Sequence, residues 1–258
     1  MRNSYRYIYG PVPSWRLGSS LGVDLISRED KVCSFDCGYC QIGETKVFSD
    51  KRQVLVPTED ILKEIKTLPD VRIDYITFSG RGEPTLAANL GEVITGIRKI
   101  RKEKIAVITN SSLMSRHDVR KDLALADFVM AKMDAHCAES LLKVNKPVKS
   151  VTFATIVDGI KKFKSDYKGK LALQIMFTAK NKDYAGDIAS VAKDIGPDEV
   201  QINTPLRPSA EKPLSRQDID AIKPYFKDMK VISVYDIEKT KTDIINKEAT
   251  LKRRGSHD

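Results

Sequence analysis

Three cysteines in the segment KVCSFDCGYCQIG have a spacing that could support redox chemistry. Cys33, Cys37 and Cys40 form a CxxxCxxC set. Cysteine thiolates are the usual ligands of a [4Fe-4S] cluster, which normally takes four of them, so three leave one iron without a protein ligand. That iron can chelate the amino and carboxylate groups of S-adenosylmethionine (SAM). One-electron reduction would then split the sulfonium and release a 5′-deoxyadenosyl radical.

The same three cysteines could instead form a zinc site or serve as structural thiols. Zinc sites usually combine CxxC pairs into four ligands, and here no second pair and no nearby histidine is present, since His117, His136 and His257 are remote in sequence. Core cysteines would lie on apolar faces, whereas this loop is rich in Ser, Asp and Gly. Tyr39, just before the third cysteine, could pack on the adenine of SAM.

A second motif, FSGRGEPT, follows one strand–helix unit later. Gly80 and Gly82 can present backbone amides and carbonyls close to a ligand, Glu83 adds a carboxylate, and Pro84 fixes the exit of the turn. By itself the motif predicts only a turn. Its position after the cysteines makes it a candidate for binding the SAM ammonium group.

The elements that position these motifs alternate between strands and helices. Short β-branched or apolar runs with little polar alternation are typical of strands buried on both faces. We predict such strands at 21–26, 72–79, 104–110, 126–134, 171–178 and 198–204, and a seventh at 230–236. Between them we predict amphipathic helices, beginning at Thr58 and spanning 89–102, 115–125, 151–165, 184–195 and 215–226.

Six strand–helix repeats imply parallel strands joined by right-handed crossovers, in a sheet that closes partly or fully into a barrel. Catalytic residues are then expected at the carboxyl ends of the strands. A basic tail that ends LKRRGSHD completes the chain.

CSFDCGYC, SGRGEPT, ITNSSLM and the MDA after the fourth strand resemble the motifs of the radical SAM superfamily. They correspond to its cluster loop, its GGEP motif, its TNG-type third-strand end and its fourth-strand ribose region. Two positions depart from the pattern: Arg81 replaces the first Gly of GGEP, and Ser111 replaces the Gly of TNG.

The opening YGPVPSWRLG more narrowly resembles a group of small radical SAM proteins related to the tRNA wyosine-synthesis enzymes, although Trp15 takes the place of an Arg. VNKP and INTPLRPSAEKPL also fit, so the resemblance covers about 220 residues. It implies an α/β fold, a partial (β/α)6 TIM-type barrel with a C-terminal strand/helix extension. We expect the barrel at 1–228, including an N-terminal arm at 1–19, and the extension with its basic tail at 229–258.

The resemblance assigns roles to residues of this chain. Cys33, Cys37 and Cys40 would ligate the cluster. The remaining candidates would contact SAM through its adenine, methionine, ribose or carboxylate parts, and Gln174 and Asn203 would face the cavity or serve as strand-end caps. These candidates are Tyr39, Gly80, Gly82, Glu83, Pro84, Thr109, Asn110, Ser111, Lys132, Asp134, Gln174 and Asn203.

Beyond the triad only Cys137 remains, so an auxiliary cluster of the kind that methylthiotransferases and twitch- or SPASM-type enzymes carry cannot be assembled. The wyosine reaction resembles auxiliary-cluster chemistry with cysteines upstream of the triad, and residues 1–32 contain none. Cys137 follows the fourth strand, where its thiol could donate a hydrogen atom or carry a thiyl radical. Alternatively, it is a small, partly buried apolar side chain, which is usual for an unpaired cysteine.

The composition limits the partners. With 44 Lys and Arg against 35 Asp and Glu, the formal charge is +9, which favours an anionic substrate such as tRNA but also serves solubility. Neither a secretory signal nor an apolar run long enough to cross a bilayer is present, so we expect a cytoplasmic protein without a membrane partner. A flavodoxin- or ferredoxin-like protein is the expected electron donor.

Four functions are therefore open. The first is a radical SAM enzyme that abstracts hydrogen from an anionic substrate, with tRNA or another RNA as the main hypothesis. The second is radical modification of a small metabolite or a peptide, and the third is a glycyl-radical activase of a partner protein. The fourth is a non-catalytic iron–sulfur carrier, which would have no use for the GxGEPT loop.

Overall fold

The computed structural model describes residues 5–238 and 241–254, and its centre is a curved sheet. The strands lie in the order β1-β2-β5-β6-β7-β8-β9-β10. Only β1 is antiparallel to its neighbour, and the other seven are parallel. Their bounds are β1 Ile8–Ser14, β2 Gly18–Val23, β5 Tyr75–Phe78, β6 Lys104–Thr109, β7 Phe128–Lys132, β8 Lys170–Met176, β9 Glu199–Asn203 and β10 Val231–Ser233.

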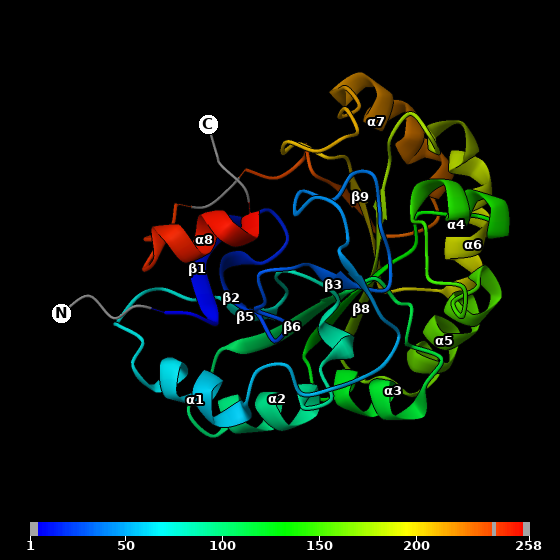
Figure 1. Ribbon diagram of the computed structural model, residues 1–258. Coiled ribbons are helices and arrows are strands. Elements are labelled where there is room, and N and C mark those ends of the chain that lie inside the picture. The colour runs from blue at the N-terminus through cyan, green and yellow to red at the C-terminus, as the bar shows by residue number, and fades with distance from the viewer. Residues whose placement is uncertain (1–4, 239–240, 255–258) are drawn as a thin grey trace.

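Helices line the convex side of this sheet (Figure 1). Each places an apolar stripe on the strands, as Ile61 and Ile65 of the first helix do, because parallel strands must be covered on this face. The helices after α1 Thr58–Lys66 are α2 Leu90–Arg98, α3 His117–Leu123, α4 Ala138–Val144, α5 Phe153–Asp166, α6 Ala185–Ile195 and α7 Arg216–Ile222. Short 3₁₀ helices lie at η1 Pro84–Leu86, η2 Lys182–Tyr184 and η3 Lys223–Phe226.

The concave face of the sheet carries a separate, smaller apolar cluster. Leu17, from the turn between β1 and β2, packs there with Ala106, Phe128, Met130 and Ala172. Side chains alternate between the two faces along a strand. A residue two positions from a cluster member on the same strand therefore also points toward the concave face. Lys132, Gln174 and Gln201 therefore form a polar row across three adjacent strands, nearer their carboxyl ends.

The predicted α/β partial barrel is confirmed, and all seven predicted strands lie in the sheet. The first was placed slightly late, since β2 is Gly18–Val23 instead of 21–26. The sequence analysis missed β1, the short strands β3 Val32–Cys33 and β4 Val47–Phe48, and helix α4. β1 contains Pro11 and Pro13, which normally argue against a strand, but it is an edge strand where proline is tolerated.

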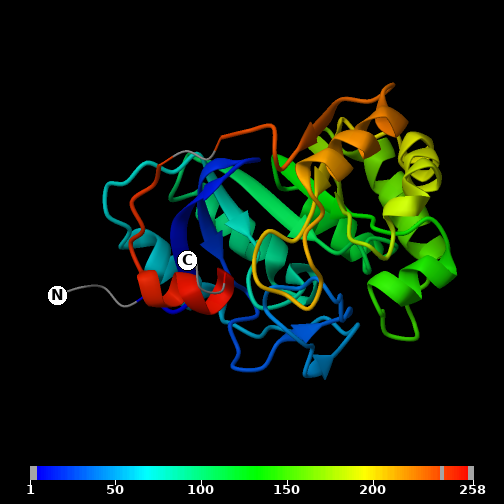
Figure 2. The same ribbon diagram turned by 90° about the horizontal axis from the view of Figure 1, so that it is seen from above.

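The expected basic tail contains a helix, α8 Lys247–Arg254, that packs along β1. Figures 1 and 2 show it beside β1, at the edge of the sheet opposite α7. Asn246 forms a bridge to Gly10, and the Gly10 amide donates to Thr250 Oγ1 (3.0 Å). The last tail residues, 255–258, lie outside the described residues. Within 5–238 and 241–254, no helix has the length and apolarity to span a membrane.

Candidate active site

The cysteine loop lies at the carboxyl end of β2, as the sequence predicts. Cys33 ends β3 and is buried, whereas Cys37 and Cys40 are half-buried. Two successive turns shape the loop, in which the amide of Cys40 donates to Cys37 O and that of Gly43 donates to Cys40 O (both 3.0 Å). The short pairing of β3 with β4 holds the loop from its other side.

The surroundings of the thiols fit an iron–sulfur cluster. Burial raises the pKa of Cys33 to about 12, with a further contribution from the Glu83 charge, and raises the pKa of Cys37 to about 11. Such thiols become thiolates only when a cation such as iron binds them. Amide nitrogens already point at two sulfurs, since Asn110 Nδ2 donates to Cys33 Sγ (3.6 Å) and Asn145 Nδ2 donates to Cys37 Sγ (3.3 Å).

In the described part of the chain, no three His, Cys, Asp or Glu side chains form a group that could hold a single metal ion.

The GxGEP loop, residues 80–84, lies directly against the cysteine loop. A Cβ at Gly82 would lie 1.9 Å from Val32 O, so only glycine permits this approach. Gly80 has φ +152°, and a Cβ there would collide with the Asp24 carboxyl. The two glycines therefore let the GxGEP backbone reach the residue before Cys33, and Pro84 begins η1.

Glu83 is buried with both carboxylate oxygens occupied by the protein. Oε1 accepts from the Thr85 amide (3.0 Å) and from the Thr85 and Thr109 hydroxyls (both 2.7 Å), and Oε2 accepts from the Asn110 amide (2.6 Å). Burial raises the pKa of Glu83, while these hydrogen bonds lower it. The side chain thus joins the ends of β5 and β6, which leaves the backbone of the loop to meet a ligand.

A second buried carboxylate, Asp134, joins the fourth strand end to the cysteine loop. Its Oδ1 accepts from the Met176 amide (2.7 Å), and its Oδ2 accepts from Asn145 Nδ2 (2.7 Å) and from the Tyr39 hydroxyl. Lys132 Nζ lies 4.4 Å from the centre of the Tyr39 ring. Tyr39 therefore belongs to a hydrogen-bonded cluster with the fourth strand, and one face of its ring already carries a cation.

The third strand end makes a sharp turn at Ser111. This residue has φ 69°, a left-handed conformation that favours glycine, which occupies the TNG position in the superfamily. Its amide donates to Thr109 Oγ1 (3.1 Å), and its hydroxyl donates to Lys132 O (3.0 Å), which links β6 to β7. Gln174 and Asn203 are buried on the concave face, and Asn203 Oδ1 accepts from the Thr204 amide (2.9 Å).

Cys137 lies apart from these contacts. It is the residue before α4, and its Sγ lies 3.4 Å from His136 Nε2. The His136 ring stacks on Tyr184 with centroids 4.6 Å apart. The structure thus gives Cys137 a local partner and no contact with the triad among the described residues, and a catalytic role for it remains a prediction.

Asn145 is a site residue that the sequence analysis missed. Its amide donates to Cys37 Sγ, the Tyr39 hydroxyl (3.0 Å) and Asp134. The VNKP motif contains Asn145, but one asparagine after a helix gives no signal of its own for such a role.

The sequence analysis included 202–214 in the resemblance but did not predict that loop 204–214 after β9 covers the cysteine loop (Figure 2). A Cβ at Gly38 would lie 2.8 Å from Glu211 Oε1, and Glu211 is paired with Lys180. Arg207 donates to Oε1 of Gln41, which follows Cys40 on the cysteine loop. Sequence pattern alone could not bring residues more than 160 positions apart together.

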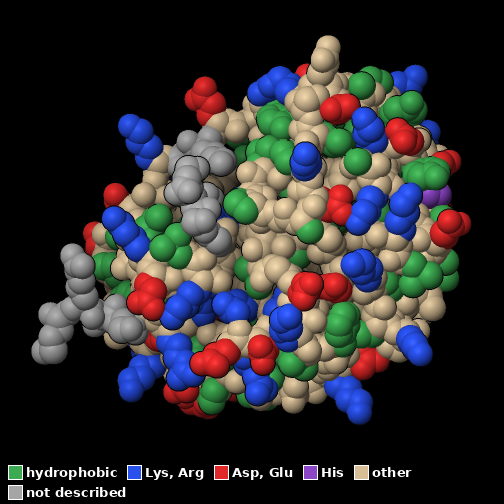
Figure 3. Space-filling model, turned by 45° about the horizontal axis from the view of Figure 1, so that its top comes forward, with side chains coloured by type: hydrophobic (Ala, Val, Ile, Leu, Met, Phe, Trp, Pro, Cys, Tyr) green, Lys and Arg blue, Asp and Glu red, His purple; other side chains and the backbone are tan. Residues whose placement is uncertain are grey.

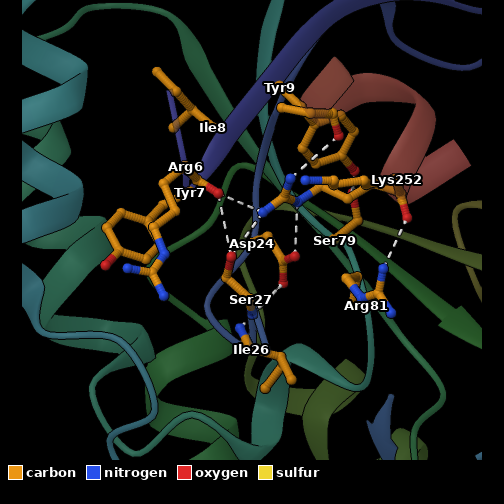
Figure 4. A network of polar contacts seen from close by, with 12 residues as sticks. Arg6, Tyr7, Ile8, Tyr9, Asp24, Ile26, Ser27, Ser79, Arg81 and Lys252 are labelled. Atoms are coloured by element: carbon orange, nitrogen blue, oxygen red, sulfur yellow. Dashed lines mark hydrogen bonds and ion pairs between the residues drawn. The ribbon is translucent and has the colours of Figure 1, made fainter. Parts of the chain in front are cut away.

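Helix α8 reaches the same motifs through its last turn (Figure 4). Arg253 Nε donates to Asp24 Oδ2 (2.8 Å), and both side chains are almost fully buried. Arg81, the departure from GGEP, donates to Lys252 O (3.3 Å). Arg81 therefore has a role that the superfamily pattern does not predict, which is to join the GxGEP loop to the carboxyl end of α8.

An open pocket lies beside this network. Arg6, Arg28, Arg81 and Lys252 line it together with Glu29, Asp30 and Glu248. Neither a triad cysteine nor any other predicted site residue borders it. It is therefore a feature separate from the site built on the cysteine loop.

Comparison with known proteins agrees with this geometry. The model of the Radical SAM superfamily matches residues 31–190, more than half of the chain. A UPF0026 protein of Synechocystis sp. is 40% identical over 223 residues, 84% of this chain and 81% of the relative. A UPF0026 protein of Methanocaldococcus jannaschii is 36% identical over 248 residues, 93% of this chain and 74% of the relative.

Among solved structures, Streptococcus suis SuiB bound to its precursor peptide SuiA superposes with a TM-score of 0.63 at 13% identity. The match covers 84% of this chain, which spans about half of the SuiB chain (48%). At this identity the likeness shows the fold alone.

Proposed function

The chain belongs to the radical SAM superfamily, and from this we propose that it holds a [4Fe-4S] cluster at Cys33, Cys37 and Cys40 and cleaves SAM to abstract hydrogen from an anionic substrate. Superfamily membership makes it an enzyme with an unknown substrate. When bound, the cluster supplies the electron that splits the SAM sulfonium and yields the 5′-deoxyadenosyl radical.

The observation that carries this proposal is the direct contact between the cysteine loop and the GxGEP loop. Val32 O lies against Gly82 and accepts from the Glu83 amide (3.3 Å), so the two motifs are in register one residue before Cys33. A mere electron carrier has no need of such a loop. The geometry supports a site in which SAM lies beside the cluster.

The chain's own residues have distinct roles in this proposal. Gly80, Gly82 and Pro84 offer backbone groups to the methionine part of SAM, and Glu83 positions that backbone through its bonds to the third strand end. The Thr109, Asn110 and Ser111 turn and the Lys132 and Asp134 pair lie at the next strand ends, where they can meet the ribose and carboxylate. Gln174 and Asn203 face the concave side, where a substrate would enter.

RNA, and tRNA in particular, is the substrate class that we propose, on the basis of the net charge of +9. The Arg253 side chain of the basic tail is not free to bind RNA, because it forms a buried ion pair with Asp24. In Figure 3, Lys and Arg side chains are mixed with Asp and Glu over the visible face. The visible face therefore carries no continuous basic surface.

A small metabolite or a peptide is the alternative substrate. SuiB, which shares the fold, has been solved with a precursor peptide, and the compact barrel suits either class. A flavodoxin- or ferredoxin-like electron donor and a cytoplasmic location complete the proposal.

The proposal is tested by the electron paramagnetic resonance spectrum of the anaerobically reconstituted, dithionite-reduced protein. We expect a [4Fe-4S] signal that changes when SAM is added, because SAM binds the open iron. Gly82→Ala is the informative variant, since its Cβ would push the GxGEP loop away from Val32 while every cysteine stays. A wild-type spectrum that SAM leaves unchanged would contradict the proposal.

A further inference from the structure

Strand β4 is an exposed apolar segment beside the cysteine loop. Side chains alternate between the two faces of a strand, so a strand that covers a core buries every second one. Val47 is 44% exposed and Phe48 is 51% exposed, which means that neither face of β4 covers a core. Within the described residues, the only strand that pairs with β4 is β3. The strand therefore offers apolar side chains and an open edge to a partner.

This exposed strand is the direct neighbour of a proposed cluster ligand. The parallel pairing of β3 with β4 places Phe48 opposite Cys33, and the Ser49 amide donates to Cys33 O (3.1 Å). Neighbouring strands lie about 4.8 Å apart, and side chains at paired positions point to the same face. Phe48 is thus an exposed aromatic side chain only one strand away from Cys33.

The segment before β4 is fixed on the cysteine loop. Thr45 is buried, its hydroxyl donates to Phe35 O (2.6 Å), and its amide donates to Asp36 Oδ1 (2.8 Å). Figure 2 shows β3 and β4, in blue, projecting at the edge of the molecule. A partner that docks there would meet a preorganised surface, which lowers the entropic cost of binding.

Exposed lysines flank β4 along the chain. Lys46 precedes the strand, and Lys51 follows it. Lys46 Nζ lies 3.1 Å from Glu44 Oε2, but both side chains are exposed, so this ion pair contributes little. Among the described residues, no acid forms an ion pair with Lys51.

A third exposed lysine comes from the segment after α4. Lys149 precedes Ser150, whose hydroxyl donates to Asp50 Oδ2 (2.6 Å) and so joins this segment to the turn after β4. Lys146, in the same segment, lies 4.0 Å from Asp36 Oδ2 and is balanced by it. Lys149 itself has no ion pair with a described residue. The apolar strand therefore lies among lysines that would attract an acidic partner.

We propose that Lys46, Val47, Phe48, Lys51 and Lys149, the β4 surface, dock an acidic protein that carries a reduced flavin and supplies the electron for the cluster. The lysines would steer and orient this protein, and the two apolar side chains would form the centre of the contact. The exposed edge of a flavin is apolar and aromatic, so it can pack on the Phe48 ring. Electron-transfer partners form small interfaces, which fits a surface of this size.

This assignment rests on the proposed function, because it names the partner that reduces the same site. One electron passes from the flavin hydroquinone, which becomes the semiquinone, to the cluster, which is reduced. No covalent bond forms or breaks. Docking at β4 places the flavin close to Cys33 without occupying the GxGEP side of the cysteine loop, where SAM is proposed to lie.

The first test measures reduction of the reconstituted protein by flavodoxin hydroquinone, in a stopped-flow instrument and without SAM. The double variant Lys51→Glu with Lys149→Glu should be reduced at least about tenfold more slowly at low salt, because surface charge can change association rates by roughly 10–1000-fold. The difference should shrink at high salt, which screens exposed charges. Lys162→Glu with Lys193→Glu makes the same change in net charge at exposed positions of α5 and α6, and should keep the wild-type rate.

The second test measures binding of oxidised flavodoxin by isothermal titration calorimetry, a readout that does not depend on electron transfer. Phe48→Ser should weaken the affinity about fivefold at low and at high salt alike, because it removes apolar area from the contact. Tyr225→Ser is the matched control. This side chain is 60% exposed and lies on η3, and its loss should leave the affinity unchanged.

Four results would overturn the assignment. The first is an equal loss of rate in both double lysine variants, since net charge alone would then explain it. The second is flavodoxin binding that neither Phe48→Ser nor Lys51→Glu with Lys149→Glu weakens. The third is faster reduction by a ferredoxin with the same losses, which would assign the surface to an iron–sulfur carrier. The fourth is a wild-type dimer in sedimentation that Phe48→Ser abolishes, which would assign it to a second copy of the chain.

Dithionite separates docking from the site itself, because this small reductant needs no docking surface. With dithionite, the Phe48→Ser and double lysine variants should give the wild-type [4Fe-4S] signal and form 5′-deoxyadenosine at the wild-type rate. An equal loss with dithionite would mean that β4 only supports the cysteine loop, and would overturn the assignment. A wild type that flavodoxin reduces but that never cleaves SAM would instead refute the proposed function and leave the docking surface in place.

Discussion

Polar groups are buried both at the strand ends around the cysteine loop (the rim, with Glu83 and Asp134) and on the side of the barrel covered by α8 (the α8 side, with Asp24 and Arg253). Different interactions stabilise the buried groups in the two regions. At the rim, the carboxylates of Glu83 and Asp134 accept hydrogen bonds from amides and hydroxyls, and Lys132 Nζ lies 3.9 Å from Asp134 Oδ2. On the α8 side, the buried carboxylate of Asp24 forms an ion pair with the buried guanidinium of Arg253. The comparison indicates that hydrogen bonds from neutral donors predominate at the rim, whereas a close, buried ion pair predominates on the α8 side.

The largest effect is expected at the rim. Replacing Cys33, Cys37 or Cys40 by Ala should abolish cluster binding, so the iron content should fall from about four per chain to near zero. Cys137→Ala is the matched control and should keep its iron, because this thiol contacts His136 instead of the triad. Equal iron in all four variants would show that the triad is not the ligand set.

Next comes the buried ion pair on the α8 side. Arg253→Met leaves Asp24 buried without its cation, which should lower the free energy of unfolding by about 3–5 kcal/mol. The double change Asp24→Asn with Arg253→Met should recover part of this loss. Urea unfolding measures both, and a single variant as stable as the wild type would mean that α8 is held by other contacts.

The rim carboxylate should give a smaller loss. Glu83→Gln places an amide among the donors of Thr85, Thr109 and Asn110, so at least one of them loses its acceptor. We expect a loss of about 1–3 kcal/mol in unfolding free energy together with weaker SAM binding. Glu92→Gln, on the exposed side of α2, is the control. A stability loss with intact SAM binding would separate the carboxylate from the site.

Asn145 should act on the cluster through its hydrogen bond to the Cys37 sulfur. Hydrogen bonds to cluster sulfurs help to set the reduction potential, and Asn145 donates to Cys37 Sγ. Asn145→Ala should therefore lower the potential in a redox titration followed by electron paramagnetic resonance. Asn145→Asp, which has the shape but no amide donor, should lower it as well. An unchanged potential in both would mean that this hydrogen bond is absent from the loaded protein.

The smallest effect is expected where the two regions meet. Arg81→Ala removes the hydrogen bonds from the GxGEP loop to Lys252 O and to Glu29 O, both partly exposed to solvent, and should cost about 0.5–1.5 kcal/mol in unfolding free energy. SAM binding should stay unchanged, because Gly80, Gly82 and Glu83 remain. If calorimetry showed a large loss of SAM affinity, α8 would have to be counted as part of the SAM site.

The same contrast between the two regions separates what the sequence predicts from what it does not. The parallel strands were predicted because burial on both faces leaves continuous apolar runs, as in β6 and β8. The cysteine spacing and the GxGEP glycines were predictable because they reflect local geometry. Ser111 shows the limit, since the turn requires a left-handed residue and a serine adopts it with support from Thr109.

What the sequence did not predict depends on contacts between distant segments. LKRR has the composition of an exposed basic tail, yet Asp24, more than 220 positions earlier, pairs with Arg253. Asn145 likewise acquires its role only when the fourth strand end, the cysteine loop and the end of α4 come together. No local pattern encodes either arrangement.

The central claim is that this site cleaves SAM. The most direct measurement is 5′-deoxyadenosine formation by the anaerobically reconstituted protein with dithionite and SAM, followed by liquid chromatography and mass spectrometry. We predict the product with the wild type and none with the Cys33→Ala, Cys37→Ala or Cys40→Ala variants. A cluster-loaded wild type that never forms 5′-deoxyadenosine, even with cell extract as a source of substrate, would contradict this claim.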